Sequence, residues 1–365
     1  ILDHADIQHI DPILSSRMRQ SIRKYQLQHP SSSLNHRIRS LDRIYRVHYS
    51  GDVSPELLAA KLKRRPDIEY AVPRYYRYLQ ETPNDPLKGK HLQFHRFYQA
   101  WDETTGSKEV IIGIIDSGVD YTHEDLLNEI WINQDEIPQN WRDSLDTDNS
   151  GTVTPREIQD FIIDRDEDLN GDGTLDLQDA LASSSPLTTG ADTDGNGHDD
   201  DLFGWDFWQS GLPNPDREQD NDPIGDFSDH GTHVGGLAGA STDNNTGISG
   251  TGYNARIMAV KAGGIKDIPE TNPDETKIIA YGYEAMLYAA TNGADIINTS
   301  WGGSAFSDFE RDIIETVTDM GVLIISASGN SGNDEVIYPA SFEQTLAVGS
   351  IEPDEQVANY SNYGY

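Results

Sequence analysis

One short segment of the sequence places a titratable base among very small neighbours. His230 lies in the octapeptide Asp-His-Gly-Thr-His-Val-Gly-Gly, residues 229–236, and imidazole is the side chain that exchanges a proton near neutral pH. The glycines would let another part of the chain approach closely, and the pattern predicts that the histidine opens a helix. His230 and His233 are three residues apart without an intervening Glu, whereas zinc proteases place two histidines four apart around a Glu. The spacing therefore favours a catalytic base over a metal pair or two polar residues at a helix start.

A carboxylate that could orient this base ends a continuous apolar run. Residues 110–116 read Val-Ile-Ile-Gly-Ile-Ile-Asp, which is typical of a strand buried on both faces of a parallel sheet. Ligands and catalytic groups gather at the carboxyl ends of such strands. Asp116 is therefore a candidate partner for His230, although taken alone it could merely cap a loop.

The rest of the chain alternates between strand and helix patterns. We expect strands over residues 256–261, 295–300 and 322–327, and helices over 277–292 and 308–320. This alternation predicts an α/β domain with a mostly parallel sheet. A dinucleotide-binding fold has the same alternation, but no GxGxxG follows the first strand.

Three candidate residues occur where strands end or a helix begins, in the order Asp116, His230 and Asn330. Asn330 ends the segment Leu-Ile-Ile-Ser-Ala-Ser-Gly-Asn. The set resembles the subtilisin-like serine proteases (subtilases) over about Pro83 to Tyr365, apart from one insertion. The resemblance implies a three-layer α/β domain in which His230 is the general base and Asp116 its orienting carboxylate. Asn330 would donate to the oxyanion, an interaction worth ~3 to 4 kcal/mol of barrier in general, although alone it could be a turn residue.

The family's nucleophilic serine belongs to a Gly-Thr-Ser segment well downstream of the asparagine, and no such segment precedes Tyr365. Ser361 matches the strand and turn before that segment and is not the nucleophile. We therefore expect this polypeptide to be a protease fragment that ends before its serine and forms no acyl-enzyme.

The resemblance also implies a substrate cleft. Ser300, Trp301 and Gly302 match the segment that pairs with an extended peptide through main-chain bonds, although Trp301 could simply belong to the core. Ala327, Ser328 and Gly329 match the wall of the primary specificity pocket.

Charge separates a basic head from an acidic body. Residues 1–80 carry 14 Lys+Arg and 8 Asp+Glu, whereas the remainder carries 13 and 54. Such acidity makes nucleic acid binding by the body implausible, and no run approaches the ~20 apolar residues of a membrane span. We expect a mobile or weakly helical polar leader over residues 1–40. Residues 41–82 would form a small α+β unit that resembles the family's inhibitory propeptide, an unrelated adaptor domain being the alternative.

That unit has its own pattern. A strand is expected near residues 44–48, then a helix that Ser54 caps and Pro55 begins, and a second strand in which Ile68, Tyr70 and Val72 alternate. As a propeptide it would lie in the cleft and be cut between about Arg74 and Lys90.

The body, residues 83–365, carries an acidic insertion at about residues 140–190. Oxygen ligands at alternate positions, a turn glycine and a closing carboxylate are what Ca²⁺ requires, and two consecutive stretches match an EF-hand loop. One helix, about residues 155–166, would join them, a spacing closer to dockerins than to paired EF-hands; a solvated acidic loop is the alternative. The ligand candidates are Asp146, Asp148, Ser150, Thr152 and Glu157 in the first loop, and Asp168, Asn170, Asp172, Thr174 and Asp179 in the second.

Two further calcium sites are expected in the body. One would use Asp192, Asp194, Asn196, the carbonyl of His198 and a closing carboxylate from Asp200. Asp125 matches a calcium ligand of the family, and the loop at residues 243–248 would complete its site.

These features together predict a secreted, calcium-dependent serine endopeptidase of the subtilisin type that acts on polypeptides. Its propeptide would be an intramolecular inhibitor, and the dockerin-like insertion raises the binding of a partner protein. The alternative from another class is a calcium-binding interaction protein on a catalytically inactive protease scaffold.

Overall fold

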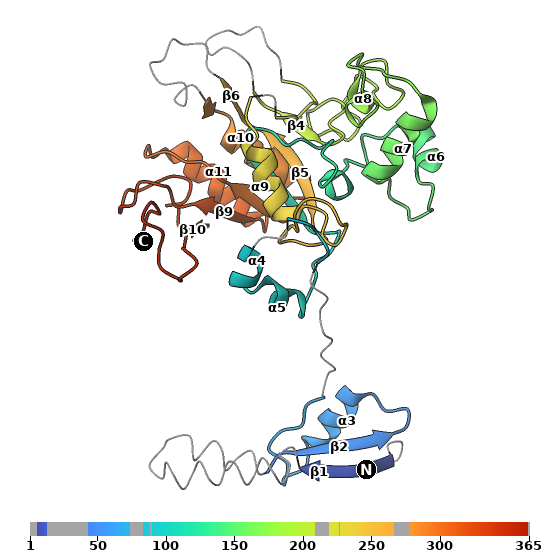
Figure 1. Cartoon of the computed structure of the whole chain (residues 1–365), viewed down its shortest axis with the longest axis vertical. Coiled ribbons are helices and arrows are strands. Elements are labelled where there is room, and N and C mark those ends of the chain that lie inside the picture. Colours follow the sequence, from blue (N-terminus) through green and yellow to red (C-terminus); the bar gives the residue numbers. More distant parts are fainter. Residues whose placement is uncertain are drawn as a thin grey trace. The chain divides into compact units, whose positions relative to one another are not determined.

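The computed structural model describes residues 6–12, 43–73, 83–87, 90–208, 219–225, 227–265 and 277–363. The chain divides into two units, Ile1–Tyr78 and Leu79–Tyr365 (Figure 1). In the described residues, no helix is both long and apolar enough to cross a lipid bilayer.

The smaller unit is built on an antiparallel pair, β1 (Asp6–Pro12) and β2 (Tyr45–Ser50). Helix α3 (Pro55–Leu62) follows, and the Ser54 hydroxyl accepts from Leu57 N at 3.3 Å. The cap and the strand near residue 45 are as predicted. Val53 and Leu58 form the small buried core.

Two predictions in this unit are wrong. Asp6–Pro12 is a strand rather than a mobile or helical stretch, because Asp11 accepts from Arg46 at 3.4 Å and bonds His48 at 3.0 Å across the pair. Because polar cross-strand contacts hold this pair, residues 6–12 lack the apolar alternation by which a strand is recognised in a sequence. No strand forms at residues 68–72, where Val72 is 72% exposed. The other residues of the expected leader lie outside the described part.

The larger unit contains a six-stranded sheet in the order β10-β9-β8-β3-β5-β4, with every strand pair parallel. Strand β3 is central because its apolar residues enter both layers: Ile112 and Ile114 pack on one face and Ile115 on the other. The strands are β3 (Ile111–Asp116), β4 (Gly204–Asp206), β5 (Arg256–Lys261), β8 (Ile296–Thr299), β9 (Leu323–Ala327) and β10 (Thr345–Val348).

Helices cover both faces of this sheet (Figure 1). Helix α9 (His230–Gly239) packs Val234 and Ala238 into the core on one face, and α10 (Gly282–Thr291) and α11 (Asp308–Asp319) build the core on the other. The three-layer α/β fold with a mostly parallel sheet is thus confirmed. The remaining short helices are α4 (Lys90–Phe94), α5 (Phe97–Trp101) and the 3-10 turn η1 (Leu127–Glu129).

The helix expected over residues 277–292 begins five residues late. Strand β7 (Lys277–Ile279) pairs antiparallel with β6 (Gly263–Ile265) before α10 begins at Gly282. A Cβ at Gly282 would lie 2.3 Å from the Trp301 ring. The glycine therefore lets α10 begin against that indole.

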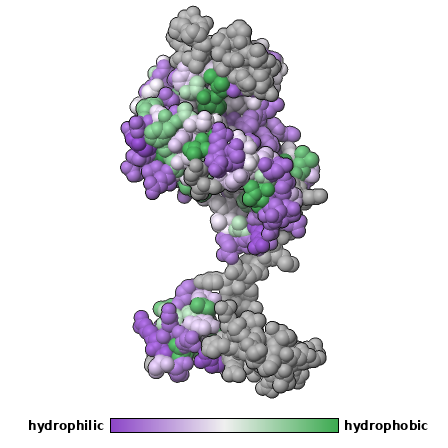
Figure 2. Space-filling model, turned by 90° about the vertical axis from the view of Figure 1, so that its left-hand side faces the viewer, coloured by the Kyte–Doolittle hydropathy of each residue, from purple (hydrophilic) through white to green (hydrophobic). Residues whose placement is uncertain are grey.

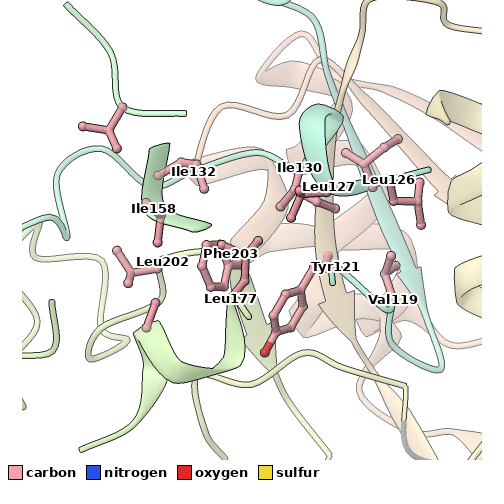
Figure 3. Close-up of a cluster of buried hydrophobic side chains, with 14 of the residues drawn as sticks. Val119, Tyr121, Leu126, Leu127, Ile130, Ile132, Ile158, Leu177, Leu202 and Phe203 are labelled. Atoms are coloured by element: carbon pink, nitrogen blue, oxygen red, sulfur yellow. The ribbon is translucent and has the colours of Figure 1, made fainter. Parts of the chain in front are cut away.

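The segment at residues 140–190 folds onto the same core. It contains α6 (Gln139–Leu145), α7 (Pro155–Arg165) and α8 (Gln178–Leu181). A reciprocal capping box of Thr154 and Glu157 begins α7. Ile158 and Leu177 then lie in one buried cluster with Tyr121 and Phe203 (Figure 3).

The visible surface of the larger unit is mostly hydrophilic, with small and separate hydrophobic patches (Figure 2). This surface is consistent with the excess of acidic residues in the body.

Candidate active site

Asp116 and His230 meet where β3 ends and α9 begins. His230 Nδ1 lies 2.7 Å from Asp116 Oδ1, which also accepts from Ser117 N at 2.7 Å. The Asp116 side chain is 3% exposed, whereas that of His230 is 52% exposed. A buried carboxylate thus holds one ring nitrogen while the imidazole remains accessible.

Close backbone packing produces this meeting. A Cβ at Gly231 would lie 2.2 Å from Gly118 O. A side chain at residue 231 would therefore keep the start of α9 farther from the end of β3. The Ser117 hydroxyl accepts from Gly231 N at 3.0 Å and donates to Ser228 O at 3.1 Å. Ser117 therefore ties the two segments together, a function that its place after Asp116 in the sequence did not indicate.

The hydrogen bond that His230 donates to the Asp116 carboxylate raises the pKa of His230 above its ordinary value, and burial of the ring partly offsets this increase. The carboxylate also favours the tautomer with the proton on Nδ1, which leaves Nε2 free to take a proton from a reacting group. The arrangement can therefore perform general base catalysis.

A pocket of about 560 Å³ adjoins this pair. Three of the predicted substrate residues, Ser300, Trp301 and Gly302, line it together with Asp116 and His230. Trp301 Nε1 donates to Ile115 O at 2.7 Å, so the indole is a wall of the pocket that is anchored to β3. The other lining residues are Ser117, Phe227, Ser228, Lys277, Ile278, Ile279, Tyr283, Gly303, Ala305, Glu310 and Tyr338.

The second group of predicted substrate residues lies after β9 and does not line this pocket. Ser328 and Gly329 are half-buried and Asn330 is exposed. A Cβ at Gly329 would lie 2.5 Å from Asn362 Nδ2, and Asn362 N donates to Gly329 O at 3.0 Å. Asn362 therefore fixes the turn that carries Asn330. Ala327, the last residue of β9, is likewise half-buried.

Ser361 is remote from the chemistry of His230. Its hydroxyl is buried, accepts from Ser350 N at 2.9 Å and donates to Asn362 O at 3.1 Å. These bonds give Ser361 a structural position.

Both EF-hand-like loops have the same internal hydrogen bonds. In the first, Asp146 Oδ2 accepts from Gly151 N at 2.9 Å, and Glu157 Oε1 accepts from Asp148 N at 3.3 Å. Carboxylate oxygens of Asp146, Asp148 and Glu157 lie within 4.8 Å of one another. Ser150 and Thr152 follow in the same loop, where the Ser150 hydroxyl bonds Thr152 O at 3.0 Å.

Several backbone hydrogen bonds of the first loop recur at corresponding positions in the second. Asp168 Oδ2 accepts from Gly173 N at 2.9 Å, Asn170 N donates to Asp179 Oδ1 at 3.1 Å, and Asp172 Oδ1 accepts from Thr174 N at 2.7 Å. In both loops the first and the last carboxylate thus accept hydrogen bonds from backbone N–H groups of the loop.

The third acidic loop is closed by a residue that the sequence did not indicate. Asp192 Oδ2 accepts from Gly197 N at 2.9 Å, and Asn196 N donates to Asp194 Oδ1 at 2.8 Å. His198 N donates to Asn196 Oδ1 at 2.8 Å.

Glu136 takes the place of the closing carboxylate in this third loop. It accepts from Asp194 N at 3.0 Å and from Asp200 N at 3.1 Å, as Glu157 accepts from Asp148 N and from Thr154 N in the first loop. Glu136 and Asp194 group with the buried Asp201. The Asp200 carboxylate, predicted to close the site, instead accepts from Thr189 N and Gly190 N.

Asp125 lies against the loop at residues 243–248, as expected. Its two oxygens accept from Asn244 Nδ2 at 2.9 Å and Ile248 N at 2.8 Å. Buried Asp85, for which the sequence analysis proposes no role, accepts from Asp243 N and the Ser249 hydroxyl. The position of this carboxylate between Pro83 and Pro86 was the signal in the sequence that could have indicated it.

The loop before α9 is tied to the second acidic loop. Asp222 accepts from Tyr121 Oη at 2.7 Å and from Gln178 Nε2 at 3.1 Å. Gln178 begins α8, directly before the closing Asp179, and Pro223 O accepts from Val119 N at 3.0 Å. The acidic loop and the strand end at Asp116 therefore share one hydrogen-bonded support.

Comparison with known proteins identifies similar sequences. The model of the Subtilase family, Peptidase_S8, matches residues 107–365. Thermophilic serine proteinase of Bacillus sp. (strain AK1) is 28% identical over 333 residues, 90% of this chain and 60% of the relative. Halolysin of Haloferax mediterranei is 29% identical over 311 residues, 85% of this chain and 44% of the relative.

A third relative, the Extracellular basic protease of Dichelobacter nodosus, is 27% identical over 84% of this chain and 44% of its own length. The chain thus spans between 44% and 60% of the length of these three relatives.

Proposed function

The chain belongs to the subtilase family, and on that premise we propose that it is part of a secreted, calcium-dependent serine endopeptidase. The observation that supports this proposal most directly is the 2.7 Å contact between His230 Nδ1 and Asp116 Oδ1 beside a pocket. A buried carboxylate, an accessible imidazole and an adjoining cleft are the parts that acyl transfer needs.

In the proposed reaction, Nε2 of His230 removes the proton of a serine hydroxyl as that oxygen attacks the substrate carbonyl. Asp116 stabilises the imidazolium that results, and His230 then returns the proton to the leaving amine. The Asn330 side chain would donate to the oxyanion. We propose that the serine belongs to a Gly-Thr-Ser segment of the longer protein, and that the polypeptide ending at Tyr365 forms no acyl-enzyme.

Calcium fits the three acidic loops and the Asp125 site because their donors are carboxylate, amide, hydroxyl and backbone oxygens. Asp146, Glu157, Asp168 and Asp179 would hold two ions, and the loop that begins at Asp192, with Glu136, a third. Bound Ca²⁺ would neutralise neighbouring carboxylates and stabilise the folded state.

The basic smaller unit is proposed to be an inhibitory propeptide. Its charge is opposite to that of the acidic body, which favours association. N-terminal sequencing of the active full-length enzyme should place the mature start between about Arg74 and Lys90, and a start upstream of Ser54 contradicts this proposal.

Secretion is proposed because one relative carries the name Extracellular basic protease, and the absence of cysteine is compatible with an oxidising compartment. The proposed substrates are polypeptides. Residues 140–190 are proposed as a calcium-binding, EF-hand-like insertion with a capacity for a protein partner.

A fluorophosphonate probe tests the enzymatic proposal. The full-length protein in calcium should be labelled and should cleave a denatured protein substrate, and His230→Ala should abolish both. The chain that ends at Tyr365 should remain unlabelled. Absence of labelling and cleavage in the folded full-length protein would favour the interaction protein on an inactive scaffold.

A further inference from the structure

A second carboxylate lies in the same pocket as Asp116 and His230. Glu310, in the first turn of α11, is half-buried and lines that pocket. It is hydrogen-bonded to the Tyr283 side chain. The proposed chemistry has no use for this group, because His230 and Asp116 already form the acid–base pair.

The walls around Glu310 are held in place. Trp301 is fixed by its bond to Ile115 O and by its close fit over Gly282. The Tyr283 and Trp301 rings meet edge to face, with centroids 5.7 Å apart and planes at 84°. Glu310 thus shares this pocket with two aromatic rings, one of which it bonds, and such rings also attract cations.

The charge of Glu310 is not neutralised by a neighbour in the described part of the chain, where no cationic side chain forms an ion pair with it. The adjacent Arg311 is held by Asp308, Asp312 and Glu315. Lys277 lines the same pocket, but its side chain is exposed to solvent. A partly desolvated carboxylate without a counter-ion gains most from a cation that the ligand brings.

We propose that Glu310 selects substrates that carry Lys or Arg at a position some residues away from the bond that is cleaved. The inference rests on the proposed peptidase function and adds a substrate class to it. A peptide whose scissile carbonyl lies at His230 would extend along the pocket between Gly302 and β7, whose strand edge is suited to main-chain pairing. The side chain that reaches Glu310 would then form a charge-assisted hydrogen bond.

The test uses the full-length protein and matched fluorogenic peptides in which Lys, Arg, Gln or Glu occupies each position in turn. At one position, Lys or Arg should raise kcat/KM about tenfold or more over Gln, the range expected for a hydrogen bond between charged groups. Glu310→Gln should reduce that preference to within about twofold. Glu343→Gln, a change at an exposed residue outside the pocket lining, should leave the preference intact.

A binding arm decides the question without turnover. Fluorescence anisotropy with the full-length His230→Ala variant compares Lys and Gln peptides, with Glu310→Gln added in a second variant. Tighter binding of the Lys peptide that disappears with Glu310→Gln supports the inference. Equal affinity of both peptides, or a preference that survives Glu310→Gln, overturns it even if the enzyme is active. Loss of cleavage in every parent assay would instead contradict the proposed function.

Discussion

Two glycines of α9 allow the same substitution to be compared in two surroundings. Gly231 and Gly235 are both buried and four residues apart, so they lie on one face of the helix. A Cβ at Gly231 would be 2.2 Å from Gly118 O, whereas a Cβ at Gly235 would meet nothing closer than Val119 Cγ1 at 3.5 Å. We predict that Gly231→Ala destabilises the protein and Gly235→Ala stabilises it.

The magnitudes follow from these distances. Replacing helical Gly by Ala gains up to ~1 kcal/mol in either place. At Gly231 the new methyl falls more than 1 Å short of the 3.4 Å at which ordinary contact begins, and the atom it meets is a backbone carbonyl that cannot rotate away. Overpacking of this kind costs about 1 to 3 kcal/mol. Because the gain in helix propensity is the same in both places, the two variants should differ by the overpacking cost, about 1 to 3 kcal/mol in the free energy of unfolding.

Urea unfolding at a fixed, saturating calcium concentration measures this difference, because ligand binding otherwise shifts the apparent stability. NMR of the imidazole should show that Gly231→Ala also changes the environment of His230, while Gly235→Ala does not. If Gly231→Ala is within ~0.5 kcal/mol of Gly235→Ala, the close approach of Gly118 and Gly231 is not what holds the catalytic pair together.

Three further changes test other parts of the site. Asp116→Asn should lower the pKa of His230, since the carboxylate raises it, and an NMR titration that shows no decrease contradicts the pairing. The contribution of the Asp116–His230 pair to the free energy of unfolding is complete below the unfolded pKa of histidine, near 6.5, and is lost as pH rises through the folded pKa. Glu136→Gln should remove one Ca²⁺ from the stoichiometry measured by isothermal titration calorimetry and reduce the calcium-dependent gain in stability, which reaches ~2.7 kcal/mol per site at a hundredfold excess over Kd; unchanged stoichiometry would be evidence against a third site. Tyr121→Phe should cost about 1 to 3 kcal/mol in urea unfolding, because the fully buried hydroxyl donates to Asp222; an unchanged unfolding midpoint would show that this bond does not stabilise the fold.

Local patterns were sufficient for β3, which carries Asp116, and for the start of α3 in the smaller unit. The apolar run to Asp116 predicted β3 because a strand buried on both faces needs no polar alternation. Ser54 and Pro55 predicted the start of α3 because a helix start is determined by a few adjacent residues. The position of Asp116 at the end of β3 followed directly.

Contacts between distant residues were beyond sequence reasoning. Glu136 closes a loop that begins 56 residues later, and no spacing rule connects it to Asp192. Strand β1 is held by polar cross-strand bonds. The late start of α10 accompanies the pairing of residues 277–279 with β6. In each case the deciding partner is determined by tertiary packing.

The buried cluster that joins α7 and α8 to the sheet has a consequence for how this protein could be recombined with others. Ile158 and Leu177 fill space beside Tyr121 and Phe203 (Figure 3), so the two sets of side chains depend on each other for burial. A cassette exchange that removed residues 140–190 would open a cavity under the catalytic strand, at a cost of about 2 to 5 kcal/mol for each large side chain lost. The same residues grafted alone onto another protein would expose an apolar face. Residues 140–190 and the sheet they pack against should therefore be transferred together, and the boundaries of a chimera should lie outside both.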